Sequence, residues 1–175
     1  CHEPEIWRAI IEGEPYPVKA LICSGNNPLV AYPNTKRVYR GLKSPNLDLF
    51  VVLEHWMTPS AMLADYVFPV TNWLEMPVMY TQTLQGHGNR VSIGEKIVEP
   101  LYERKPDYYF YQGLGLRLGQ GKYWKKTLEE EWDWCLQPLL DELKLESAEE
   151  FASKVRWLTQ SAVEKRYEKI DPETG

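Results

Sequence analysis

The sequence predicts an α/β protein, with a doubly wound, mostly parallel sheet of the Rossmann-like type and a helical C-terminal extension. Residues 19–23, 47–53 and 66–68 are short apolar runs without polar alternation. Such runs are typical of strands that are buried on both faces. The segments between the runs contain helix-favouring residues, as the crossovers between parallel strands do. This alternation of strand and helix favours a parallel sheet.

The first crossover is expected to contain a helix. Residues 34–43 carry helix-favouring side chains, and the pair Ser44-Pro45 follows them. A proline disfavours helical geometry in the residue before it, so we expect the helix to end near this pair. The second strand then occupies residues 47–53, which are almost entirely apolar.

The second crossover is shorter and carries a helix-start signal. Thr58 is a suitable N-cap, and Pro59 stands at the first helical position. We therefore predict a short helix over residues 60–64. The third strand follows at residues 66–68 and stops at Pro69.

Helical signals fade over residues 72–100, where glycines and polar residues indicate an extended excursion with turns. They return at residues 106–118, with Gly119 as the expected C-cap. Capping-box sequences begin at Thr127 and Ser147 and predict two further helix starts. An apolar stripe consists of Trp132, Leu136, Leu139, Leu140 and Leu143. Such a stripe is typical of a core, and covering a neighbouring domain outside this chain is the alternative that stays open.

These patterns predict three parts. Residues 1–105 form the α/β segment, and residues 106–166 form the helical extension. Residues 167–175 are polar and are predicted to be a linker. The chain begins with Cys1 rather than Met, so we expect it to be an internal fragment of a longer polypeptide.

The composition restricts the function classes. The chain has 175 residues, is 43% hydrophobic and carries a net charge of −5. A packed core is therefore expected, whereas the acidic balance argues against a nucleic-acid partner. No stretch approaches the roughly 18 uncharged apolar residues of a membrane span. The cysteines and histidines are scattered, so local spacing predicts no metal site.

Polar residues follow each predicted strand. In open α/β sheets, ligands bind outside the carboxyl ends of the strands. The first strand places four candidates at this edge, namely Ser24, Gly25, Asn26 and Asn27. The second strand adds Glu54 and His55, and a carboxylate at this position can accept from ribose hydroxyls or from a guanine N–H edge. A plain turn at the asparagines and a solvated Glu54 explain the same pattern, so both interpretations stay open at this point.

Longer motifs resemble a known family. GNNPL at residues 25–29, LFVVLEHWMTPSAMLADYVFP at 49–69 and WLE at 73–75 are similar to the molybdopterin oxidoreductases related to dimethyl sulfoxide reductase. That family has a GxNP turn, a strand with an acidic end, and then TPTA, ADVVLP and Trp-x-Glu. Residues 106–119 resemble its following helix. The ending at residues 167–175 resembles the linker before its C-terminal barrel.

The resemblance implies a cofactor and its contacts. The parent would be a catalytic subunit that holds molybdenum or tungsten between two molybdopterin guanine dinucleotides. Asn27 matches the family's dinucleotide-contacting asparagine, and Leu53 with Glu54 matches the pair that grips the guanosine end. Glu54 replaces the usual Asp, and Met76 stands where some members place a cofactor-contacting Lys. Ser24, Gly25, Asn26 and His55 flank these positions as further cofactor-binding candidates.

The resemblance also implies partners. These are the other domains of the same subunit, an iron–sulfur electron-transfer subunit, and a [4Fe–4S] cluster in an N-terminal part outside this chain. The parent would oxidise or reduce a small substrate, whereas the fragment alone is expected to be inactive and to contain no catalytic residue. The alternative is a non-catalytic scaffold of the same fold, as in the large subunit of respiratory complex I. Exported and cytoplasmic locations are both compatible with the motifs.

Overall fold

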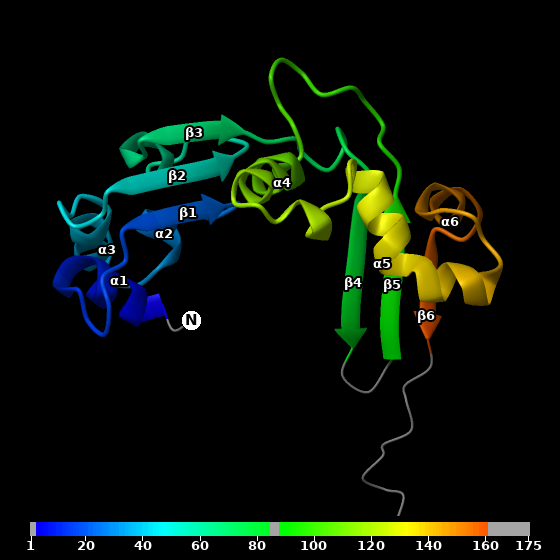
Figure 1. The fold of residues 1–175 in the computed structure, drawn as a ribbon, viewed down its shortest axis with the longest axis horizontal. Helices are drawn as coiled ribbons and strands as arrows, with labels where there is room; N and C mark the ends of the chain where they lie inside the picture. Colours follow the sequence, from blue (N-terminus) through cyan, green and yellow to red (C-terminus); the bar gives the residue numbers. More distant parts are fainter. Residues whose placement is uncertain (1–2, 85–87, 161–175) are drawn as a thin grey trace, which may run out of the picture. The chain divides into compact units, whose positions relative to one another are not determined.

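The computed structural model describes residues 3–84 and 88–160 (Figure 1). The chain forms two compact units. The first comprises Cys1–Asn72 and Pro100–Tyr111, and the second comprises Trp73–Glu99 and Gln112–Gly175. The linker expected at residues 167–175 lies outside the described residues, and the division expected after residue 105 stays a prediction.

The first unit contains a three-stranded parallel sheet in the order β1-β2-β3, whose arrows point the same way in Figure 1. Its elements are α1 (Glu3–Glu12), β1 (Ala20–Ser24), α2 (Pro28–Ala31), α3 (Thr35–Leu42), β2 (Leu49–Glu54), η1 (Ala61–Leu63), β3 (Tyr66–Pro69) and the start of α4 (Asp107–Arg117). The three strands and the helix of the first crossover are confirmed within one or two residues.

The central strand β2 is buried on both sides. Phe50 and Val52 belong to one core cluster, with residues of α1 and α3. Val51 and Leu53 belong to another, with Phe110 of α4 packed against it. Successive side chains of a strand point to opposite faces, so helices cover both faces of this sheet. Because both faces of β2 are buried, its sequence is apolar without interruption from Leu49 to Leu53.

The helix of the second crossover is shorter than predicted. Only a single 3-10 turn, η1, lies where a helix was expected over residues 60–64. The Asp65 carboxylate accepts from the Phe50 N–H (2.7 Å), and the Asp65 N–H donates to the Phe50 carbonyl (2.8 Å). These bonds fix Asp65 to the sheet, which leaves room for one turn. Thr58 does not occupy the N-cap position of η1, which is Ser60, but its Oγ1 still accepts from the Ala61 N–H at 3.2 Å.

The second unit contains a three-stranded antiparallel sheet in the order β4-β5-β6. Its elements are β4 (Val78–Leu84), β5 (Gly88–Gly94), η2 (Gly121–Tyr123), α5 (Leu128–Leu143), α6 (Ala148–Lys154) and β6 (Trp157–Gln160). Leu136 and Leu140 of α5 and Phe151 of α6 form its core with Ile93 of β5. The predicted apolar stripe is thus confirmed as core.

This second sheet agrees with one expectation, the extended excursion, and corrects another. The excursion over residues 72–100 contains the β4–β5 hairpin, and the extension over residues 106–166 is not purely helical because it contains β6. In the register of β5 and β6, Ser92 is paired with Trp157. A pairing between segments so far apart in sequence leaves no local signal. The Arg90 guanidinium also lies 5.6 Å from the Trp157 ring centroid, and this cation–π contact adds to the pairing of β5 with β6.

Both predicted capping boxes are present. Thr127 Oγ1 accepts from the Glu130 N–H (3.1 Å), and Ser147 Oγ accepts from the Glu150 N–H (3.1 Å). In a capping box the glutamate accepts from the N–H of the N-cap residue. Here Glu130 accepts instead from the N–H of Lys126 (2.9 Å), the residue before the N-cap. Within the described ranges, no helix combines the length and the apolarity that crossing a bilayer requires.

Removing the first cap should destabilise α5. We expect Thr127→Ala to lower the free energy of unfolding by about 1 kcal/mol, because one helix-end N–H loses its acceptor. Thr127→Ser keeps the hydroxyl and should stay close to the original stability. Urea unfolding followed by circular dichroism measures both variants, and an alanine variant as stable as the serine variant would contradict the assignment.

Candidate functional site

The candidate site is the edge of the parallel sheet where its strands end. β1 ends at Ser24, β2 at Glu54 and β3 at Pro69. Because the strands are parallel and adjacent, their carboxyl ends meet at one edge. The loops that leave this edge carry the polar residues that the sequence singled out, and we call this edge the rim.

Gly25 opens the first rim loop in a left-handed conformation, with φ +58°. Its N–H donates to the Leu53 carbonyl at 3.0 Å, which joins the ends of β1 and β2. A Cβ added at Gly25 would meet no heavy atom within 4 Å, so the backbone here borders open space. Glycine is therefore required by the backbone angle, and its openness lets a ligand approach the main chain.

Asn27 has a partner far away in the sequence. It is the N-cap residue of α2, yet its side chain makes no capping bond. Instead, its Oδ1 accepts from Ser60 Oγ (2.6 Å) and from the Ser60 N–H (3.3 Å). Its Nδ2 has no partner among the described residues. The plain-turn interpretation does not account for this arrangement, because the amide is held by the loop after β2.

Asn26 and Ser24 are held differently. Asn26 Nδ2 donates to the Tyr32 hydroxyl at 2.6 Å, a local bond of the kind that a turn would make. Ser24 Oγ donates to an Asp107 carboxylate oxygen at 2.9 Å. This bond joins the end of β1 to the first residue of α4, which is an acidic residue at a helix N-terminus.

Glu54 and His55 form a bonded pair. Glu54 Oε1 accepts from the His55 N–H (2.8 Å) and lies 3.4 Å from His55 Nδ1. His55 Nε2 lies 3.0 Å from the Thr71 carbonyl oxygen, so the imidazole bridges the loops after β2 and β3. The Glu54 side chain is only 10% exposed. Its Oε2 has no partner in the part of the chain that the structure describes, which leaves one acceptor available.

Leu53 and Met76 differ from the other predicted site residues. The Leu53 side chain is completely buried, and its carbonyl is already bonded to Gly25. Met76 belongs to the second compact unit, where it lies partly buried just before β4. The structure therefore brings Ser24, Gly25, Asn26, Asn27, Leu53, Glu54 and His55 together in the first unit, whereas Met76 is part of the second unit and its role stays a prediction.

Two ionisable groups close to the rim stay protonated near neutral pH. Burial raises the pKa of the Cys23 thiol to about 11, so this cysteine is neither a nucleophile nor a thiolate ligand there. Burial, and secondarily the Asp107 carboxylate, raises the pKa of Tyr111. In the described residues there is no group of three His, Cys, Asp or Glu side chains that could hold a metal ion.

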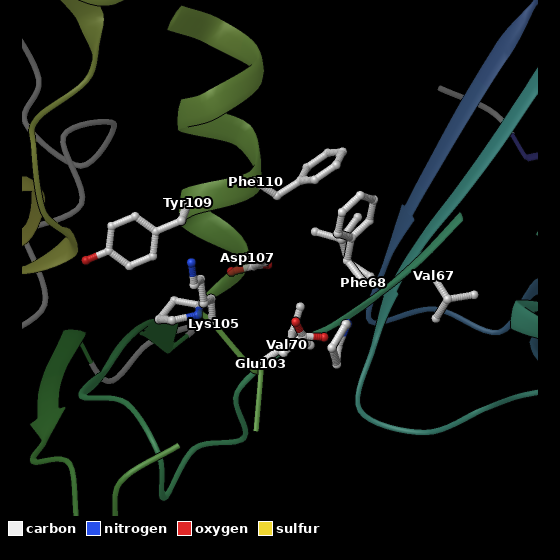
Figure 2. A pocket seen from close by; sticks show the side chains of 11 residues that line it. Val67, Phe68, Val70, Glu103, Lys105, Asp107, Tyr109 and Phe110 are labelled. Atoms are coloured by element: carbon white, nitrogen blue, oxygen red, sulfur yellow. The ribbon is translucent and has the colours of Figure 1, made fainter. Parts of the chain in front are cut away.

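A cavity of about 610 Å³ lies in the same unit (Figure 2). Its apolar side includes Phe68 and Phe110, whose ring centroids are 5.1 Å apart. Its polar side includes Lys105 and Asp107 near the start of α4, as Figure 2 shows. Its volume falls within the range of small-molecule sites, roughly 300–1,000 Å³. Asp107 lines this cavity and also accepts from Ser24, so the cavity borders the rim.

Sequence reasoning missed two residues of the site. Ser60 was interpreted only as part of a helix start, and Asp107 only as the beginning of a later helix. Ser60 contacts Asn27 across 33 positions, and Asp107 contacts Ser24 across 83. The sequence contains one signal that could have indicated Ser60. It lies in the segment TPSA at residues 58–61, which belongs to the block that resembles the family motif.

Comparisons with known proteins identify the same family. The family description "Molybdopterin oxidoreductase" matches residues 9–115. The chain is 38% identical to the acetylene hydratase of Syntrophotalea acetylenica over 129 residues, or 71% of this chain. It is 34% identical to the dopamine dehydroxylase of Eggerthella lenta over 147 residues, or 83% of this chain.

A solved structure supports the likeness in three dimensions. The acetylene hydratase from Pelobacter acetylenicus superposes with a TM-score of 0.77 and 30% identity, and the match covers 89% of this chain. The chain spans only 20% of that structure, and 17% and 14% of the two curated relatives. The matched relatives are therefore several times longer than this chain.

Proposed function

Because the chain belongs to the molybdopterin oxidoreductase family, we propose that its first unit binds the guanosine end of a molybdopterin guanine dinucleotide. The three-stranded sheet would then be part of a larger Rossmann-like sheet. The longer parent would be the catalytic subunit of a molybdenum or tungsten oxidoreductase. It would hold two such dinucleotides.

The donors and acceptors at the rim fit a nucleotide. Asn27 offers the two N–H groups of Nδ2, and Glu54 offers Oε2, while their other polar atoms are already bonded within the chain. A guanosine diphosphate group presents acceptors on its phosphates and base and donors on its ribose and base. The open space above Gly25 admits such a group to the backbone. The observation that carries the proposal is that Asn27 and Glu54 follow the adjacent parallel strands β1 and β2 at the same edge, each with a polar atom that bonds to no described residue.

Each residue of the rim has a distinct task in this proposal. Asn27 donates to an acceptor of the nucleotide, and Glu54 accepts from the ribose or from the guanine edge. His55 keeps Glu54 in place and ties its loop to Thr71. Ser24 holds Asp107, and with it the start of α4, at the end of β1. The bound metal centre would supply the redox chemistry of the parent.

The substrate is set outside this segment. The matched relatives are named for acetylene hydration, for dopamine dehydroxylation and for the reduction of dimethyl sulfoxide and trimethylamine N-oxide. All of them share this segment with the chain, so it supports a task that is common to them. For the parent we propose, as partners, its other domains and an iron–sulfur electron-transfer subunit, together with a [4Fe–4S] cluster outside this chain.

Metal and pterin analysis of the full-length parent tests this function. We expect about one molybdenum or tungsten and two pterins per polypeptide, measured by mass spectrometry and by fluorescence after acid oxidation. The host must be able to make the cofactor. A folded parent that carries neither metal nor pterin from such a host would instead support the non-catalytic scaffold.

A further inference from the structure

We propose that Ser60 is a positioning residue that orients the Asn27 amide, so that Asn27 offers the nucleotide a hydrogen-bond donor and not an acceptor. This inference rests on the proposed function and adds a residue to it. Ser60 is completely buried and lies in the loop after β2, whereas Asn27 lies in the loop after β1. Ser60 would act through Asn27 without touching the ligand.

The orientation of the amide follows from the Ser60 backbone. A backbone N–H can only donate, and the Ser60 N–H lies 3.3 Å from one terminal atom of the Asn27 side chain. That atom must therefore be the oxygen Oδ1. The nitrogen Nδ2 is then the atom left for another partner. The two terminal atoms of the amide are thus distinguished by the hydrogen bonds that they can form.

The Ser60 hydroxyl strengthens the same orientation. Its oxygen accepts from the Leu29 N–H at 3.0 Å, and Ser60 Oγ lies 2.6 Å from Asn27 Oδ1. A hydroxyl has a single proton, and neither Leu29 N–H nor the Ser60 N–H can accept it. The proton therefore goes to Asn27 Oδ1. Because Ser60 is completely buried, its hydroxyl has no water as an alternative partner, and these bonds are stronger than they would be in water.

The chain of bonds links two loops. Leu29 lies in α2, directly after the Asn27 loop, so Ser60 binds that segment at two points. Without the hydroxyl, the 3.3 Å bond from the Ser60 N–H would be the remaining constraint on the amide. The side chain could then adopt orientations in which Nδ2 no longer faces the nucleotide's acceptor. Affinity for the nucleotide should fall although Asn27 itself is unchanged.

The test uses the full-length parent, produced without cofactor and titrated with GDP by calorimetry. We expect Ser60→Ala to weaken GDP binding about tenfold, which corresponds to about 1.4 kcal/mol. Ser60→Thr keeps the hydroxyl and should restore most of the affinity. Asn27→Asp, which replaces the donor by a second acceptor, should weaken binding at least as much as Ser60→Ala.

Two controls separate positioning from general stability. Thr58→Ala removes the acceptor of the Ala61 N–H in the same loop, so it should lower Tm but leave the Kd for GDP unchanged. In an Asn27→Ala background, Ser60→Ala should have no further effect on Kd, because its only route to the ligand has been removed. Tm is measured for every variant, since a merely structural role would change Tm without this dependence on Asn27.

The outcomes distinguish the two proposals. If the original parent binds GDP and Ser60→Ala binds it equally well, Ser60 does not position Asn27, and the proposed function stands. The same conclusion follows if Ser60→Ala weakens binding equally with and without Asn27. If the original parent does not bind GDP at all, the proposed site is wrong, and the role of Ser60 falls with it.

Discussion

Replacing Glu54 with alanine in the cofactor-free parent is expected to weaken GDP binding by about 10- to 100-fold. Hydrogen bonds that involve a charged group contribute about 1.5–3 kcal/mol, and each 1.4 kcal/mol is about tenfold in affinity. Glu54 Oε1 is already bonded to the His55 N–H, so the loss concerns the acceptor at Oε2. Isothermal titration calorimetry with GDP measures the effect.

Two further variants define the cause. Glu54→Gln keeps an oxygen for His55 but replaces the second acceptor by a donor, so it should bind GDP almost as weakly as the alanine variant. Asp48→Ala removes one carboxylate just before the opposite end of β2, where this carboxylate forms an exposed ion pair with Lys19 at 3.7 Å. It should leave the affinity unchanged. Equal affinities for Glu54→Ala and Asp48→Ala would remove Glu54 from the site.

The second large effect concerns stability. We expect Phe50→Ala to reduce the free energy of opening of the parallel sheet by about 3–5 kcal/mol, which is typical of a deleted core phenylalanine. Phe50 is only 2% exposed and packs in the cluster that contains Trp7, Val38 and Val52. Hydrogen exchange of the β1–β3 backbone amides measures this free energy directly.

A matched control lies on the neighbouring strand. Tyr66 is also an aromatic strand residue, but it is 60% exposed on β3. Tyr66→Ala should therefore change the free energy of opening by less than about 1 kcal/mol. A Phe50→Ala effect as small as that of Tyr66→Ala would mean that β2 is not the centre of this core.

Much of the first unit could be predicted because its signals are local. A strand that is buried on both faces must be apolar throughout, and this made β2 visible in the sequence, while the partly buried β1 was visible as a shorter apolar run. The caps at Thr127 and Ser147 were also predictable, since a cap acts within three residues. Polar residues directly after apolar runs indicated the rim, because parallel strands bring their carboxyl ends to the same edge.

The parts that could not be predicted depend on contacts between distant residues. The pairing of β6 with β5 joins segments with intervening helices, so no local pattern indicated it. The short turn η1 results from bonds between Asp65 and Phe50 on different strands. The role of Ser60 depends on Asn27 and Leu29, which lie 33 and 31 positions before it in the sequence. Local spacing carries no information about such bonds.

The central claim is that Asn27 and Glu54 together hold the guanosine end of the cofactor. An experimental structure of the cofactor-loaded parent tests it most directly. We predict that Asn27 Nδ2 and Glu54 Oε2 each lie within hydrogen-bond distance of one guanosine diphosphate moiety, roughly 2.7–3.2 Å from its polar atoms. A cofactor whose guanosine end lies away from both side chains, with Nδ2 and Oε2 bonded only to protein or water, would contradict the account.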